Sequence, residues 1–221
     1  MAKLLKVEFH CHTIWSMDSL IPVPDLVKMA HKRGLDRLVI TDHNVIGGAK
    51  EAQAIDPELV IIGEEILTTK GELLAFFVKE EIPAGLEPAQ TIHLLRDQGA
   101  FISVSHPFDR LRHGWDETDL MELSSRIDAI EIFNARCFPT NLNRLAKQFA
   151  IAHKLAGTAG SDAHALFEVG RATQSIPHFN DAEDLRQSIL QSQYSVRSSS
   201  ILVRFTSIYA KMVKKRNAQS Q

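Results

Sequence analysis

The sequence is poor in cysteine and contains no long apolar run. Cys11 and Cys137 are the only cysteines among 221 residues, too few for a disulfide framework. No segment approaches the roughly 18 consecutive apolar residues that a membrane-spanning helix needs. The first residues, Met-Ala-Lys-Leu-Leu, run directly into a strand pattern and leave no room for a signal peptide. We therefore expect a reduced, cytoplasmic protein.

The sequence also lacks a charge excess, an internal repeat and a low-complexity linker. Its net charge is −2, which predicts no global attraction to nucleic acid or to an anionic membrane, although local basic patches remain possible. The apolar content of 44% and the charged content of 24% are ordinary for a globular protein. The length suits one domain, or one domain with a small appendage.

Short apolar segments alternate with helical patterns along most of the chain. Strands are expected at 4–9, 38–41, 59–63, 73–78, 101–104, 129–133 and 157–160, and helices at 25–33, 48–55, 88–97, 116–125, 140–155 and 182–191. Such alternation indicates βαβ units and a mostly parallel sheet. Six or seven units in about 195 residues favour an α/β barrel over an open sheet.

Residues that can bind metal ions follow nearly every predicted strand. His10 and His12 lie two residues apart on the first strand, so both imidazoles point to one face. Similar residues recur at the carboxyl ends of later strands, where α/β barrels build their active sites. The set is His10, His12, His43, Glu65, His106, Asn134, Asp162 and His164, with Asp18 in the first loop. Together they predict a metal centre.

Five short motifs carry a resemblance to a known family. They are His10-Cys11-His12-Thr13 with Ser16-Met17-Asp18, Thr41-Asp42-His43-Asn44, Gly63-Glu64-Glu65, Ser105-His106-Pro107 and Gly160-Ser161-Asp162-Ala163-His164. In this order the chain resembles the polymerase and histidinol phosphatase (PHP) family of metal-dependent phosphoesterases. The resemblance implies a distorted seven-stranded (βα) barrel over residues 1–199, with two or three divalent ions (Mn, Zn or Fe).

The resemblance also implies which residues bind each ion. One ion would be held by His10, His12, Glu65 and Asp162, and another by Asp18, His43 and His164. A third would lie between Glu65 and His106. Trinuclear members complete this third site with a further histidine, whereas this chain has Asn134, a poorer ligand; His113 or Cys137 are weakly supported substitutes.

Two acidic residues next to the motifs need separate interpretations. The family strand ends in Gly-x-Glu before an apolar residue, which selects Glu65, so Glu64 should point the other way. Asp42 either orients the ring of a metal-binding histidine or caps the following turn. Cys11 alternates away from its neighbours and should be packed in the core.

Several residues are candidates for substrate chemistry. Arg136, just after a strand end, is the first candidate for gripping a phosphate in a fork geometry, and Arg171 is the second. Arg110 and Arg112 would contact a longer substrate. His164 or His106 would protonate the leaving group if not fully committed to metal.

The resemblance favours a small stand-alone phosphoesterase acting on nucleotides or on the 5′ end of short oligonucleotides through a metal-activated water. A histidinol-phosphatase-like phosphomonoesterase is the alternative, followed by a metal-binding regulatory module without catalysis. Hydrolysis of a C–N bond would need a catalytic carboxylate free of metal, which the sequence does not identify. We expect a phosphorylated small molecule or a short oligonucleotide as the partner, and no stable protein partner.

The last segment, 200–221, differs from the barrel in pattern. Apolar residues recur at helical spacing from Ile201 to Val213, and the end is basic, with Lys214, Lys215 and Arg216. The simplest interpretation is a terminal helix docked on the barrel. Contact with a nucleic-acid backbone or, less favoured, with a membrane surface are the functional interpretations.

Overall fold

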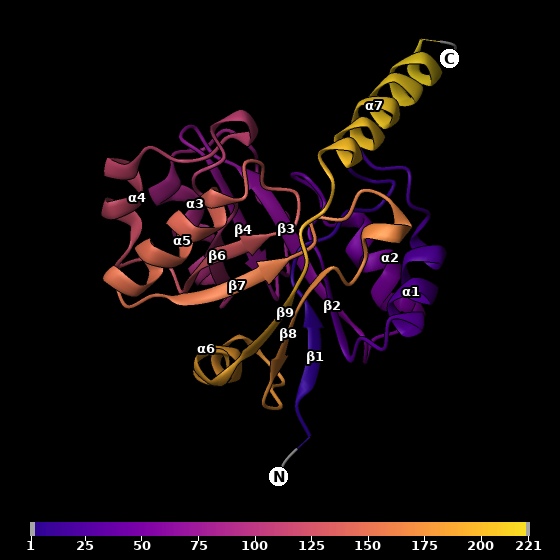
Figure 1. Cartoon of the computed structure of the whole chain (residues 1–221). Coiled ribbons are helices and arrows are strands. Elements are labelled where there is room, and N and C mark those ends of the chain that lie inside the picture. The colour runs from indigo at the N-terminus through magenta and orange to yellow at the C-terminus, as the bar shows by residue number, and fades with distance from the viewer. Residues whose placement is uncertain (1–2, 220–221) are drawn as a thin grey trace.

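One sheet organises the molecule. The computed structural model describes residues 3–219; residues 1–2 and 220–221, at the ends of the predicted barrel and the predicted tail, lie outside the described residues. The described strands form a single sheet in the order β7-β6-β5-β4-β3-β2-β1-β8-β9 (Figure 1). Their bounds are β1 Leu5–Glu8, β2 Arg37–Ile40, β3 Val60–Leu67, β4 Glu72–Phe76, β5 Phe101–Val104, β6 Ala129–Asn134, β7 Ala156–Gly160, β8 Ala172–Ile176 and β9 Gln193–Val196.

Helices follow most of the strands, as the alternating pattern predicted. Their bounds are α1 Val23–Lys32, α2 Gly47–Ile55, α3 Pro88–Asp97, α4 Glu117–Leu123, α5 Asn141–Ala152, α6 Ala182–Ser188 and α7 Arg204–Ala218, with short 3₁₀ turns at Arg110–Arg112, Leu166–Glu168, Ile189–Gln191 and Ile201–Val203. α3 starts at a capping box, in which Glu87 and Gln90 bond to each other's backbone N–H. None of the described helices is both long enough and apolar enough to cross a membrane.

Parallel strands carry most of the sheet, and antiparallel strands interrupt it. β1, β2 and β3 are parallel, as are β5, β6 and β7. β4 runs antiparallel to both β3 and β5, and β8 runs antiparallel to β1 and β9. The sheet curls into a nearly closed barrel, which confirms the predicted α/β barrel class with a distorted strand arrangement.

Side chains close the barrel where the strand ladder is missing. The Gln174 amide of β8 accepts a hydrogen bond from the Ala159 N–H (2.8 Å) and donates to the Gly157 carbonyl (3.0 Å), both on β7. The Tyr194 hydroxyl of β9 donates to the same carbonyl at 3.2 Å. One buried side chain thus joins the two ends of the curled sheet.

An apolar cluster drawn from alternate strand residues fills the interior. Phe9, Phe76 and Phe101 stack in sequence, with ring centroids 5.1 and 5.5 Å apart. Two further clusters pack the helices against the outside of the sheet. Because Phe9 directly precedes His10, the aromatic stack lies beside the strand end that carries the first predicted ligands.

Two strands were not predicted, and one is longer than predicted. β8 has the sequence ATQSI and β9 the sequence QYSV, so neither shows the continuous apolar run of a buried strand. β3 continues through Glu64 and Glu65 to Leu67 because it pairs with β4 over that stretch. Glu65 therefore lies within a strand, near its carboxyl end.

Candidate metal centre

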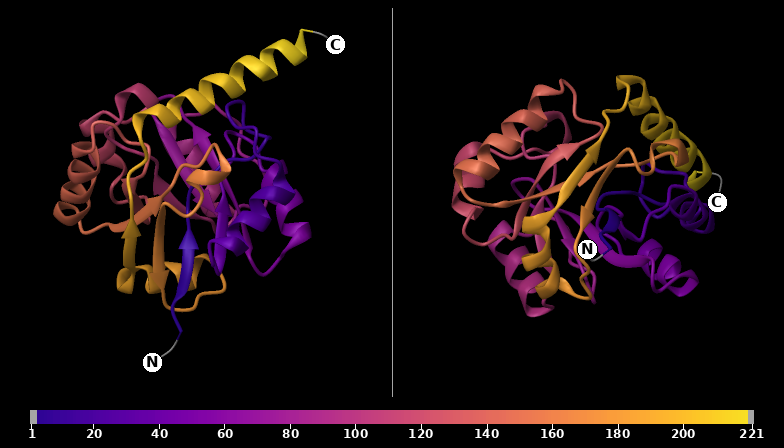
Figure 2. Two further views of the ribbon diagram at one scale, coloured as in Figure 1. Left: turned by 45° about the vertical axis from the view of Figure 1, so that its right-hand side comes forward. Right: turned by 60° about the horizontal axis from the view of Figure 1, so that its bottom comes forward.

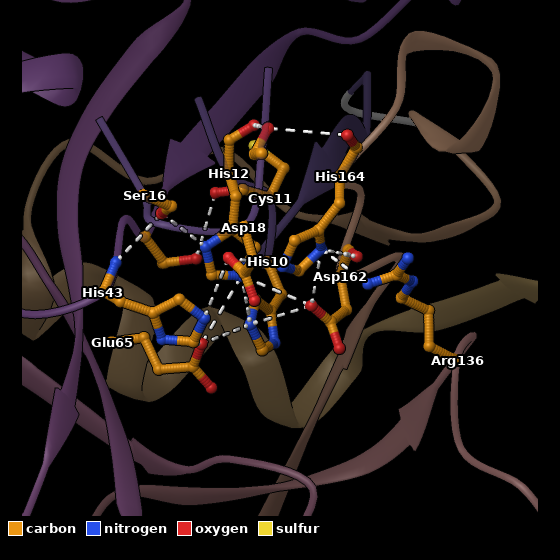
Figure 3. A network of polar contacts seen from close by, with 12 residues as sticks. His10, Cys11, His12, Ser16, Asp18, His43, Glu65, Arg136, Asp162 and His164 are labelled. Atoms are coloured by element: carbon orange, nitrogen blue, oxygen red, sulfur yellow. Dashed lines mark hydrogen bonds and ion pairs between the residues drawn. The ribbon is translucent and has the colours of Figure 1, made fainter. Parts of the chain in front are cut away.

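The predicted ligands lie together at one end of the barrel. They come from β1 and its loop, the residues after β2, β3, the residues after β5 and the residues after β7 (Figure 3). Most of these side chains are buried, with exposed fractions of 0% for His10 and His12 and 1% for Glu65. Their donor atoms form three overlapping groups.

The first group consists of His10, His12 and Asp162. The Nε2 atoms of the two histidines are 3.1 Å apart, and Asp162 Oδ1 lies 3.3 Å from His12 Nε2. Burial, followed by the charges of His164 and His43, lowers the pKa of His12 to about 4. A neutral imidazole at this position can offer its lone pair to a cation.

The second group consists of His12, His43 and His164, with the Asp18 carboxylate beside it. Asp18 Oδ1 lies 3.2 Å from His164 Nε2 and 3.6 Å from His43 Nε2. Although burial alone would raise the pKa of Asp18, the charge of His164 holds it well below its usual range. Asp18, His43 and His164 are the residues expected at the second ion, whereas His12 was expected at the first.

The third group contains a ligand that sequence reasoning missed. It consists of Glu65, Glu72 and His106. His106 Nε2 lies 3.2 Å from Glu65 Oε1 and 3.4 Å from Glu72 Oε2. Burial and then the charge of Glu65 raise the pKa of Glu72 to about 7. Two buried carboxylates and an imidazole pointing at one spot are a donor set that a divalent cation would stabilise.

The residues present fit a cluster of divalent ions. Oxygen and imidazole nitrogen donors suit Zn, Mn and Fe alike. Asp18 Oδ1 is buried beside the His164 and His43 rings and makes no hydrogen bond of good geometry among the described residues, so it can bind a cation. The donor set therefore satisfies the chemistry that the motifs predicted.

Outer residues fix the orientation of the histidine rings. His10 Nδ1 lies 3.0 Å from Glu131 Oε1, and His12 Nδ1 lies 3.0 Å from Ser16 Oγ. Ser16 in turn donates to Asp42 Oδ1 at 2.6 Å. Each contact places the ring proton on Nδ1 and leaves Nε2 facing the cluster. Asp42 thus acts on His12 through Ser16, while Glu131 was not identified from the sequence.

Backbone geometry at β7 brings Asp162 into place. Asp162 has φ +53°, in the left-handed region that non-glycine residues rarely adopt. A Cβ on Gly160 would lie 2.2 Å from the Cβ of His10, so only glycine permits this approach of the strands.

Asn134 supports the cluster from outside. Its Nδ2 donates to Glu131 Oε2 (3.0 Å) and to Asp162 Oδ2 (3.2 Å), and its Oδ1 accepts from the Arg136 N–H at 2.9 Å. The doubt about a third ion rested on this residue being a poor ligand. The structure instead offers Glu72 to that group.

Arg136 is held inside the protein rather than facing open solvent. Its Nε donates to Glu168 Oε1 at 3.0 Å, and Nη1 contacts His164 Nδ1 at 2.8 Å. The remaining contacts run from Nη1 to Ser207 Oγ and from Nη2 to the Val203 carbonyl and Thr206 Oγ1. Four of the five guanidinium N–H groups have oxygen acceptors within the protein and the fifth faces His164 Nδ1, so this geometry leaves few for a substrate phosphate.

The other arginines that were predicted to contact the substrate lie at different distances from the cluster. Arg171 donates to the Ser198 carbonyl at 2.8 Å and does not line the cavity. Arg110 is exposed and pairs with Asp116. Arg112 reaches the centre, where it contacts Asp162 and Asn134. Its guanidinium lies beside the cluster and the cavity, which Arg136 and Arg204 also line.

The remaining alternatives have clear positions. Glu64 points away from the cluster and accepts from the Ile82 N–H at 3.1 Å. Cys11 is fully buried among apolar side chains, as expected. Cys137 contacts Arg112 at 3.3 Å, and His113 lines the cavity; neither belongs to the three ligand groups of the described residues.

A cavity of about 340 Å³ opens onto the cluster. Its floor carries the ligand-type residues, and its walls carry cations, including Arg112, Arg204 and Lys211. Acidic and imidazole groups therefore face basic groups across one space. Such an arrangement suits an anionic ligand bound to cations on the floor.

Sequence comparison identifies a family model and two relatives. The model PHP_C, described as PHP-associated, matches residues 140–194. The uncharacterized protein MJ0417 of Methanocaldococcus jannaschii is 36% identical over 172 residues, which are 76% of this chain and 69% of that protein. MJ1587 of the same organism is 33% identical over 144 residues, 59% of this chain and 82% of the relative.

Structural comparison finds similar folds at low sequence identity. A two-domain Bacteroides vulgatus protein, containing a predicted PHP-like metal-dependent phosphoesterase, superimposes with a TM-score of 0.73 at 19% identity. The match covers 89% of this chain and 66% of that one. The lesion-specific endonuclease EndoQ of Pyrococcus furiosus gives a TM-score of 0.62 at 14% identity, covering 86% of this chain and 57% of the endonuclease.

Proposed function

This chain belongs to the PHP family, and we propose that it is a metal-dependent phosphoesterase acting on nucleotides or on the 5′ end of short oligonucleotides. The family model over residues 140–194 and the shared fold support the resemblance that the motifs predicted. The observation that carries the proposal is the convergence of three ligand groups on one cavity with basic walls.

Divalent ions bound to these groups would lower the pKa of an attacking water and neutralise charge that builds on the phosphoryl oxygens. The first ion would be held by His10, His12 and Asp162 with Glu65, the second by Asp18, His43 and His164, and the third by Glu65, Glu72 and His106. Mn, Zn and Fe all suit this donor set.

The protein's own residues would supply orientation and proton transfer. Arg112 has its guanidinium beside Asp162 and the cavity, so it joins Arg136 as a candidate for contacting a substrate phosphate. His106 or His164 would protonate the leaving oxygen only if that ring did not bind a metal ion. Arg136 would hold His164 in position through the 2.8 Å contact.

The basic residues that line the cavity and its modest size favour a small phosphorylated substrate or the end of an oligonucleotide. On an oligonucleotide, we therefore expect 5′-exonuclease activity rather than internal cleavage. The endonuclease EndoQ shares the fold, which is compatible with a nucleic-acid substrate. A cytoplasmic location would supply such substrates. Histidinol phosphate is the second candidate, because the third ligand group supplies the fuller site that this chemistry would use.

The test is hydrolysis by the Mn-loaded protein of AMP, a 5′-phosphorylated short RNA and histidinol phosphate. We expect phosphate or mononucleotide release from at least one of the first two. Asp18→Asn should lower the rate by at least about 100-fold, because it removes a charged ligand at the metal. Asp116→Asn, an exposed aspartate distant from the cluster, is the matched control. Tight ion binding without cleavage of any substrate would instead indicate a regulatory module.

A further inference from the structure

α7 lies across the end of the barrel that carries the metal centre. Figure 2 (left) shows this C-terminal helix spanning that end of the molecule, with the strand β1 pointing toward it. The residues that contact the site are Arg204, Ser207, Lys211 and Lys214, at intervals of three, four and three. These intervals place all four on one face of a helix.

The first turn of α7 is fixed to the site through Arg136. The Arg136 guanidinium donates to the Val203 carbonyl (2.7 Å), to Thr206 Oγ1 (3.1 Å) and to Ser207 Oγ (2.9 Å). The same guanidinium contacts His164 Nδ1 at 2.8 Å. A buried arginine thus connects a metal-ligand candidate directly to the helix.

Cations of α7 reach the cavity and the loop that carries Asp18. Lys211 Nζ lies 3.5 Å from Asp18 Oδ2. Arg204 Nη2 lies 3.3 Å from Asp109 Oδ2, and its Nε has no hydrogen-bond partner among the described residues. Lys214 donates to the carbonyls of Ile14 and Ser16 in the loop after β1.

The other face of α7 argues against simple hydrophobic docking. Phe205, Ile208, Tyr209 and Met212 are more than half exposed, whereas Arg204, Ser207 and Lys211 line the cavity. A helix that packs only for stability buries its apolar side. α7 instead presents its charged side to the cavity. Basic side chains in this position can bind an anionic ligand in the cavity.

We propose that α7 forms one wall of the active site and that Lys211 binds the phosphate of the substrate. This inference rests on the proposed function and assigns the helix to its substrate. A divalent ion held by Asp18, His43 and His164 would repel the Lys211 ammonium from Asp18. The flexible four-carbon side chain then turns to the anionic ligand of that ion, where a point charge binds phosphate oxygens well.

The test measures binding of inorganic phosphate to the Mn-loaded protein by calorimetry, for wild type, Lys211→Gln, Lys211→Arg and Lys215→Gln. Lys215 is the matched control, since it is exposed on the same helix and does not line the cavity. We expect about tenfold weaker phosphate binding for Lys211→Gln, partial recovery for Lys211→Arg, and wild-type binding for Lys215→Gln. Bound manganese, measured by elemental analysis, should not decrease in any variant.

The outcomes separate this inference from the proposed function. Equal phosphate binding by Lys211→Gln and wild type overturns the inference, even if the enzyme hydrolyses nucleotides. Loss of phosphate binding together with loss of bound manganese also overturns it, because Lys211 would then act on the ions. Weaker phosphate binding in a protein that cleaves no substrate would support the inference and reject the proposed function.

Discussion

A single carboxylate, Glu72, completes the third ligand group. Glu72 lies at the start of β4 and is 5% exposed, with its oxygens facing His106 and His43. Without it, Glu65 and His106 would be the only two members of the third group among the described residues. With it, the third group has two carboxylates and an imidazole.

We predict that Glu72→Gln binds one divalent ion fewer than wild type. The amide keeps the side-chain volume but removes the charge that balances a cation between Glu65 and His106. Manganese per chain, measured after removal of free metal, checks this. Glu64→Gln is the matched control, because Glu64 is buried on the same strand pair but lies outside the cluster. Identical metal content in the Glu72→Gln and wild-type proteins would contradict the assignment.

The sequence predicted most of the cluster because most ligands follow parallel strands. His43, His106 and Asp162 each come after a strand whose carboxyl end faces the site, as barrels require. Glu72 escaped this rule because β4 is antiparallel, so its amino end faces the site. A search of both ends of each hairpin strand would have found it.

Residues whose roles depend on contacts with distant elements were harder to predict. Arg136 follows a strand end, which suggested a substrate contact, but two of the partners that occupy its guanidinium belong to α7, about 70 residues away in sequence. Glu131 lies within a strand among apolar neighbours and gave no signal. Sequence spacing reports which face a residue is on, but not which distant element covers it.

At the scale of elements, β3 buries two neighbouring glutamates on opposite faces. Glu65 faces the cluster, whereas Glu64 faces the segment after β4 and bonds to the Ile82 N–H. Burial, followed by the nearby charge of Glu81, raises the pKa of Glu64 to about 8. Glu64 is therefore largely protonated in the folded protein at neutral pH.

This element predicts a pH dependence of stability that Glu64→Gln should remove. The carboxyl keeps its proton in the folded state up to about pH 8 but loses it near pH 4.5 when unfolded. The unfolded state therefore binds fewer protons between these values, and the free energy of unfolding falls as the pH rises through this window. The loss should be of the order of 4 kcal/mol between pH 5 and pH 9. Urea unfolding of both proteins from pH 5 to pH 9 measures it; parallel curves would contradict the prediction.

Element positions followed from the sequence, and their pairing did not. The seven predicted strands and six predicted helices all have counterparts, mostly within one to three residues, because apolar runs and caps are local signals. β8 and β9 were missed since they are short and rich in polar residues. The proposed division at residue 199 falls between β9 and the 3₁₀ turn before α7, and it stays a prediction.

At the scale of the whole molecule, closure of the barrel positions the metal centre. The candidate ligands come from both sides of the gap between β7 and β8. His10 follows β1, which pairs with β8 on one side of the gap, and Asp162 follows β7 on the other side. The Asp162 N–H donates to the His10 carbonyl at 2.8 Å across this gap. Across the same gap, the Gln174 side chain of β8 makes two hydrogen bonds to the β7 backbone, at Ala159 and Gly157.

We predict that Gln174→Leu destabilises the protein by about 2 to 3 kcal/mol, because it leaves the buried Ala159 N–H and Gly157 carbonyl without their amide partner while roughly preserving volume. Urea unfolding at fixed metal concentration measures the change. Gln193→Leu, on the exposed face of β9, is the control and should change stability by less than about 0.5 kcal/mol. Because His10 and Asp162 depend on the same closure, Gln174→Leu should also weaken manganese binding. Unchanged stability would mean that backbone contacts alone close the barrel.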